Sequence, residues 1–88
     1  MEPQQEASGI RMWVEPRSRN RVATIIENFP ADWNLDALVR EFRHAFRCGG
    51  IIDFKRGLTI IRLQGDQRQN VLDFCAERGV GEDAFMQM

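Results

Sequence analysis

Residues 51–68, IIDFKRGLTIIRLQGDQR, decide the predicted fold. Their two apolar runs, IIDF and LTIIRL, are rich in β-branched residues and flank Lys55-Arg56-Gly57, a pattern typical of a β-hairpin. Gly57 suits the turn because glycine takes positive φ angles without steric cost. The stretch therefore predicts two strands joined by a basic turn.

A helix is expected directly after this hairpin. Gly65 permits a sharp turn out of the second strand. Asp66 and Gln69 have the spacing of a capping box, in which two side chains satisfy backbone N–H groups at a helix start. Gly79 can end the helix in a left-handed conformation. The buried stripe of this helix is expected to consist of Val71, Leu72 and Cys75.

The upstream half of the chain repeats this order loosely. Residues 10–14 and 22–26 predict two strands, and the polar segment 15–21 between them predicts an exposed loop because it contains a strand-breaking proline. Asn34 is a good N-cap for a helix that Gly49-Gly50 should end. The apolar face of that helix is expected to consist of Leu35, Leu38, Val39, Phe42 and Phe46.

The order of elements is ββαββα, and residues 83–88 can add a short edge strand. The predicted fold class is therefore α+β, a two-layer α/β sandwich with an antiparallel-rich mixed sheet and both helices on one face. Residues 1–9 are expected to form a flexible N-terminal tail, and residues 10–88 one domain. The aromatic residues assigned mainly to the core or its boundary are Trp13, Phe29, Trp33 and Phe54, with Trp33 the most exposed.

The composition excludes several classes of protein. The 88 residues, 43% of them hydrophobic, suffice for one small domain with a modest core. No apolar run approaches the roughly 18 residues of a membrane-spanning helix, and the N-terminus lacks the features of a secretory signal. Cys48 and Cys75 form no CxxC motif, so we expect reduced thiols, no metal site and a cytoplasmic protein. His44 has no nucleophile nearby in the pattern, so neither catalysis nor a cofactor is expected.

The net charge of −1 conceals an uneven distribution of charge. Residues 10–68 carry 11 basic against 7 acidic side chains, whereas residues 69–88 are acidic. Eleven of the 12 basic residues are arginine, whose planar guanidinium suits phosphates and stacks on bases. Six of the arginines form two groups. A solvent-exposed hairpin tip and the solvent-exposed face of a helix would also be expected to carry such charges. The first group is Arg17, Arg19 and Arg21, and the second is Arg40, Arg43 and Arg47 together with His44.

The hexapeptide Leu63-Gln64-Gly65-Asp66-Gln67-Arg68 resembles a specific motif of the eukaryotic translation initiation factor 1 family, which are small start-codon fidelity factors. Other matches occur in the same order, so the similarity extends over about residues 10–86. These matches are Leu38-Val39-Arg40, Phe42-Arg43, Phe46, Cys48 and Gly50 around the first helix, and Thr24, Phe74, Glu77 and Gly79 elsewhere.

The resemblance implies a non-enzymatic α/β sandwich protein that binds the small ribosomal subunit beside the P site. There it would favour the scanning-competent state and reject mismatched start codons. The implied partners are rRNA of the small subunit, the initiator tRNA complex and other initiation factors, with a monomeric protein and no membrane. The two arginine groups are the expected rRNA contacts, and Lys55 and Arg56 would lie near the initiator tRNA.

Some features depart from the family pattern. Ser18-Arg19-Asn20-Arg21 stands where the family has Asn-Gly-Arg-Lys, and the family's second hairpin loop is more acidic. The family's longer N-terminal tail and its final His-Gly-Phe have no counterpart, so we expect a divergent member. Asp66 is expected to be structural, while Arg68 needs either a carboxylate or RNA as its partner.

Two alternative functions stay open. The first is a structured-RNA-binding module of the same fold without a role in initiation. The second is a protein-interaction module, which would dock through the acidic residues Asp73, Glu77, Glu82 and Asp83.

Overall fold

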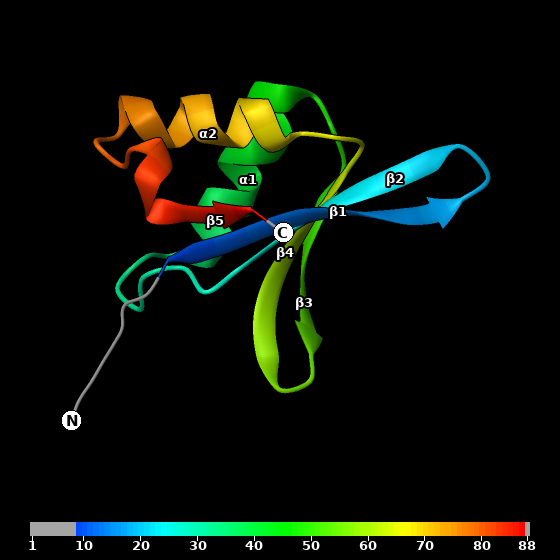
Figure 1. Ribbon diagram of the computed structural model, residues 1–88, viewed down its shortest axis with the longest axis horizontal. Helices are drawn as coiled ribbons and strands as arrows, with labels where there is room; N and C mark the ends of the chain where they lie inside the picture. The colour runs from blue at the N-terminus through cyan, green and yellow to red at the C-terminus, as the bar shows by residue number, and fades with distance from the viewer. Residues whose placement is uncertain (1–8, 88) are drawn as a thin grey trace.

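The computed structural model describes residues 9–87, so the expected tail, apart from Gly9, and Met88 lie outside the described residues. The sheet has the strand order β3-β4-β2-β1-β5; all neighbours are antiparallel except β1 and β5, which are parallel (Figure 1). The predicted α+β sandwich with a mixed sheet is confirmed. The elements are β1 (Ile10–Ser18), β2 (Arg21–Glu27), α1 (Leu35–Phe46), β3 (Gly50–Lys55), β4 (Leu58–Gln64), α2 (Arg68–Glu77), a 3₁₀ turn (Glu82–Ala84) and β5 (Phe85–Gln87).

Both helices cover the same face of the sheet (Figure 1). Because successive side chains of a strand point to opposite faces, every second strand residue can be buried beneath the helices. Phe42 of α1 and Val71 of α2 are fully buried against this face. Each large apolar side chain buried there contributes about 1.5–3 kcal/mol to folding. The strand residues buried beneath the helices include Met12, Ile26, Ile61 and Leu63, and the predicted apolar stripes of both helices are confirmed.

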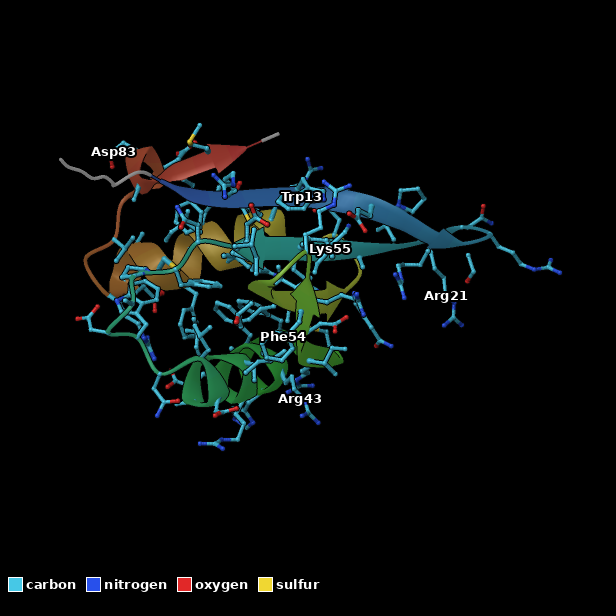
Figure 2. The ribbon with its side chains drawn as sticks, turned by 90° about the horizontal axis from the view of Figure 1, so that it is seen from below. Trp13, Arg21, Arg43, Phe54, Lys55 and Asp83 are labelled. Carbon is cyan, nitrogen blue, oxygen red and sulfur yellow. The ribbon has the colours of Figure 1, made fainter. Side chains whose placement is uncertain are left out.

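The opposite face of the sheet carries a second, smaller core. Ala23, Ile25 and Ile60 are buried there beside Trp13, in a cluster that contains no helical residue. The sheet twists so strongly that Lys55 Nζ on β3 lies 3.0 Å from the Glu15 carboxylate on β1, although two strands separate β3 from β1 in the sheet order. Figure 2 shows Trp13 beside Lys55, so the curvature itself covers this cluster.

The first hairpin is longer than predicted, because β1 continues through Pro16 to Ser18. The prediction of a loop over residues 15–21 is therefore wrong, because only Arg19 and Asn20 form the turn, although residues 16–21 are exposed as expected. Val22 O accepts a hydrogen bond from Gly65 N at 2.8 Å, on the side away from β1, so Pro16 N faces the outer edge of β1. This edge is open because β5 pairs with β1 only as far as Met12, and a strand tolerates proline there.

The first helix begins as predicted but ends differently. Asn34 Oδ1 accepts a hydrogen bond from Ala37 N at 3.1 Å, which confirms the N-cap. At the other end Arg47, rather than a glycine, takes the left-handed conformation, with φ of 52°. The two following glycines instead allow close approach. A Cβ on Gly49 would lie 2.7 Å from Gln64 Oε1, and one on Gly50 would lie 2.7 Å from Leu63 Cδ2.

The predicted capping box at the second helix is wrong. Gln67 precedes the first helical residue and provides no side-chain cap, and Gln69 Nε2 donates to Asp73 Oδ1 at 3.0 Å instead of turning back. Asp66 nevertheless holds the helix start, because its Oδ1 accepts from Arg68 N at 3.2 Å. The structural role predicted for Asp66 therefore rests on this hydrogen bond to the residue two positions further along the chain.

The end of α2 confirms the prediction for Gly79, which has φ of 86°. Gly79 N donates to Ala76 O at 3.0 Å and Val80 N donates to Cys75 O at 2.9 Å, the two bonds of a Schellman motif. The chain then reverses into β5, the predicted edge strand.

One aromatic assignment is wrong, because Phe54 is 73% exposed near the end of the β3–β4 hairpin (Figure 2). Phe54 pairs with Thr59 at the turn end of this hairpin, and it does not belong to the core that α1 covers. Phe29 and Trp33 are partly buried with their ring centroids 5.8 Å apart, as expected of boundary residues. The prediction that Trp33 is the most exposed of the four aromatics is wrong, because Trp33 packs against the core while Phe54 is exposed.

Candidate nucleic-acid interface

The two arginine groups of the sequence meet at one concave surface. Arg17 and Arg21 from the β1–β2 hairpin and Arg43 from α1 line a groove of about 850 Å³, to which β4 adds Arg62. We call this the arginine groove. The twist of the sheet and the short connection between α1 and β3 place these side chains together, although they are far apart in the sequence.

A second hollow continues the arginine groove along α1. It shares Arg43, Gly49 and Gln64 with the groove, so the two form one continuous surface. We call it the helix hollow. Its remaining lining residues are Arg40, His44, Arg47 and Cys48. All four members of the predicted helix group are therefore found here.

Arg19 is the one member of the first group that lines neither hollow. It lies at the tip of the hairpin, where its φ angle is 46°. The left-handed conformation at this exposed turn separates Arg19 from Arg17 and Arg21. Its predicted contact with RNA would therefore be made outside the groove.

Apart from Arg62, which pairs with Asp53, the arginines that line these two hollows are uncompensated within the described chain. Neither the hairpin arginines nor those of α1 form an ion pair with a carboxylate of residues 9–87. Glu41, which lies on the same helix as the basic stripe, instead pairs with Arg78, the residue that follows α2. Like charges at helical spacing repel by a few tenths of a kcal/mol per pair. A polyanion bound to this surface would relieve that repulsion.

The hexapeptide motif positions the walls of the groove. Gln64 Oε1 accepts from Gly49 N at 3.2 Å and Gln64 N donates to Gly49 O at 2.9 Å, which ties the end of α1 to β4. The buried Thr24 hydroxyl donates to Gly65 O at 2.7 Å and accepts from Gln67 N at 2.8 Å. Gly65 needs its freedom here because its φ angle is 83°.

Arg68 has a carboxylate as its partner. Its Nε lies 2.9 Å from Asp66 Oδ1 and its Nη2 lies 2.7 Å from Asp66 Oδ2, a bidentate pair. Hydrogen bonding by Arg68 holds the pKa of Asp66 below its usual value and raises the pKa of Arg68. The charge of Arg68 is thus already compensated within the turn.

Lys55 and Arg56 lie apart from the arginine groove. They line a separate hollow on the face opposite the helices, together with Trp13. Hydrogen bonds from Trp13 Nε1 at 2.9 Å and Lys55 Nζ at 3.0 Å hold the pKa of Glu15 below its usual value. Arg56 occupies the turn with φ of 54°, followed by Gly57 with φ of 79°, which confirms the predicted hairpin.

Arg62 is the groove residue that sequence reasoning missed. Its Nη2 lies 2.6 Å from Asp53 Oδ2, and its Nε is buried without a hydrogen-bond acceptor in the described part of the chain. The backbone N–H of Phe54 and then Arg62 hold the pKa of Asp53 below its usual value. A single arginine inside the apolar run LTIIRL was the available signal, because strand alternation puts it on the face opposite the helices.

No group of three or more His, Cys, Asp and Glu side chains gathers in residues 9–87, and none of the described helices has the length and apolar character needed to cross a membrane.

Comparison with known proteins identifies the family. The model of the translation initiation factor SUI1 family matches residues 6–81, most of the chain. Human eukaryotic translation initiation factor 1 is 31% identical over 75 residues, which cover 84% of this chain and 66% of the human protein. The Drosophila melanogaster factor eIF1 is 24% identical over 83% of this chain and 67% of its own length, and the SUI1 homologue of Salix bakko is 27% identical over 81% and 64%. The chain therefore spans just under two thirds of the human relative, and it belongs to the SUI1 translation initiation factor family.

Proposed function

We propose that this protein is a translation initiation factor that binds the small ribosomal subunit near the P site and promotes scanning and accurate start-codon selection. Membership of the SUI1 family and the similarity to human eukaryotic translation initiation factor 1 support the role in initiation.

The observation that carries the proposal is the continuous basic surface. Arginines from a hairpin and from a helix converge on it, and no carboxylate of residues 9–87 pairs with those of either group. Guanidinium groups bind RNA phosphates through charged hydrogen bonds and release condensed counterions when they do so. We propose that rRNA of the small subunit occupies this surface.

The second hairpin would face the initiator tRNA complex. Because Lys55 is paired with Glu15, Arg56 is the cation left available at this turn in the described chain. This hairpin would therefore make the weaker nucleic-acid contact. Other initiation factors would bind elsewhere, and the acidic side chains Asp73, Glu77, Glu82 and Asp83 are all exposed.

The first test is binding of the purified protein to purified small ribosomal subunits at several salt concentrations. If phosphate contacts dominate, the logarithm of the association constant falls linearly with the logarithm of the salt concentration. The magnitude of the slope should be about 0.9 or smaller for each phosphate contact. Binding that does not depend on salt would contradict the proposal and favour the protein-interaction module.

The second test measures start-codon selection in cells. A reporter pair that begins with AUG or with a near-cognate codon compares initiation at the two starts when the protein is depleted or overproduced. We expect depletion to raise near-cognate initiation relative to AUG. An unchanged ratio, together with salt-dependent binding, would favour a structured-RNA-binding module without a role in initiation.

A further inference from the structure

The arginine groove combines charge with an apolar floor, which phosphate binding alone does not require. Ile51, which lines the groove, is 51% exposed, and Val22, which also lines it, is partly exposed. The four arginines line the same groove as these apolar side chains. An exposed isoleucine beside these arginines offers an apolar surface on which the flat face of a base can lie.

The size of the groove also favours a ligand smaller than a helix of RNA. Its volume of about 850 Å³ lies within the range of small-molecule sites, about 300–1,000 Å³. An A-form duplex is convex and would contact only the rim of such a groove. An unpaired nucleotide that has left the stack can enter it, because its base is flat and its phosphate stays at the rim.

The chemistry of the walls matches such a nucleotide. Unstacked bases in RNA are bound by stacking on aromatic rings or on the planes of arginine guanidinium groups. No aromatic residue lines the groove, so Arg17, Arg21 and Arg43 would provide the stacking planes.

Arg62 adds an unmet hydrogen-bonding requirement to the groove. Its Nη2 is anchored to Asp53, but its Nε is buried without an acceptor in residues 9–87. An unsatisfied buried donor costs free energy, and a ligand oxygen that entered the groove with a small shift of the side chain would supply the acceptor.

We infer that the arginine groove binds a single unpaired nucleotide that projects from structured RNA, with the base over Ile51 and between arginine planes and the adjoining phosphate at the rim. This inference rests on the proposed binding of RNA and specifies the kind of RNA bound. It predicts a preference for a bulged stem over a perfectly paired stem of equal length.

The test measures binding of the full chain to two RNA hairpins of identical length at low salt. One hairpin is fully paired and the other carries one unpaired adenine in the stem. We expect the bulged hairpin to bind about tenfold more tightly, the scale of one base-stacking contact. Equal binding of the two hairpins would overturn the inference and leave the proposed RNA binding intact. Failure of both to bind would overturn both.

Two pairs of variants locate the preference in the groove. Ile51→Ser should reduce the bulge preference, whereas Leu58→Ser should not, because Leu58 is similarly exposed, at 47% against 51%, but lies outside the groove. Arg62→Met should also reduce the bulge preference. Arg11→Met should leave it unchanged, because Arg11 is likewise ion-paired but lies outside the groove. Circular dichroism and thermal unfolding establish that each variant folds. A preference that survives in folded Ile51→Ser and Arg62→Met would overturn the location.

Discussion

The two hairpins of this protein both have basic tips, but these tips have different surroundings in the structure. Both turns are basic, and in Figure 1 the β1–β2 and β3–β4 hairpins project in different directions from the sheet. Arg17 and Arg21 of the first hairpin line one groove with Arg43 and pair with no carboxylate of residues 9–87. In the second, Lys55 is paired with Glu15. A basic turn is therefore available to a polyanion only where tertiary contacts leave its charge uncompensated.

The largest expected effect comes from removing the uncompensated charge. Arg17→Ala with Arg21→Ala should weaken binding to small ribosomal subunits about tenfold for each charged hydrogen bond that is lost. The salt slope should fall by about 2, because each phosphate contact contributes about 1. The measurement is equilibrium binding across salt concentrations.

The matched comparison is Lys55→Ala with Arg56→Ala, which also removes two charges. Because Lys55 already has a carboxylate partner, this variant should lose less affinity than the first one. Equal losses from both hairpins would remove the distinction drawn between them. Chemical denaturation of each variant shows whether the fold is retained.

A stability effect of intermediate size is expected at Thr24 of the first hairpin, whose hydroxyl holds the turn between β4 and α2. Thr24→Val should lower the free energy of unfolding by about 1–3 kcal/mol, because it leaves the Gln67 N–H without its buried acceptor. Thr59→Val on β4 is the control, since Thr59 is half-buried and is not part of this hydrogen-bonded turn. Urea denaturation measures both variants. Equal stability of the two would mean that the Thr24 hydrogen bonds add nothing.

The smallest effect is a pH dependence of the ion pair between Glu15 on β1 and Lys55 of the second hairpin. The pKa of Glu15 lies below its ordinary value of 4.5, through hydrogen bonds from Trp13 and Lys55. A lowered folded pKa contributes stability above the unfolded value, and this contribution is lost as pH falls through the folded pKa. Glu15→Gln should therefore flatten the loss of stability below pH 4.5, by about 0.2–1 kcal/mol because the pair is partly exposed.

The control for this pH dependence is Glu82→Gln, which changes an exposed carboxylate with no ion pair among residues 9–87. Its acid denaturation curve should keep the shape of the unmodified protein's curve. If Glu15→Gln and Glu82→Gln flatten it equally, the Glu15–Lys55 pair does not stabilise the fold.

Most of the elements could be predicted because their signals are local. The cap at Asn34, the turn at Gly57 and the helix end at Gly79 each depend on residues within one turn of themselves, and all three were correct. The errors arose where a distant segment decided the outcome. Pro16 remains in a strand because β5 stops short of it, and Phe54 is exposed because its end of β3 projects past the core that α1 covers.

The same distinction applies to the candidate site. The two arginine groups were visible in the sequence as a basic middle segment, but their meeting at one groove was not. The sequence did not predict Arg62 as a groove residue, because a lone arginine in a strand resembles an ordinary surface residue. Its position depends on the register of β4 against β2 and β3.

By itself, the sequence determined the order of strands and helices, the apolar faces that pack together and the composition of the basic segments, because hydrophobic periodicity and turn chemistry act over a few residues. Only the tertiary structure decided which charges find partners. Asp66 neutralises Arg68, Glu15 neutralises Lys55 and Glu41 is drawn away to Arg78, and these contacts leave the hairpin and helix arginines uncompensated. The physical reason is that ion pairing depends on distances of a few ångströms between side chains, which the twist of the sheet and the close approach at Gly49 and Gly50 bring about.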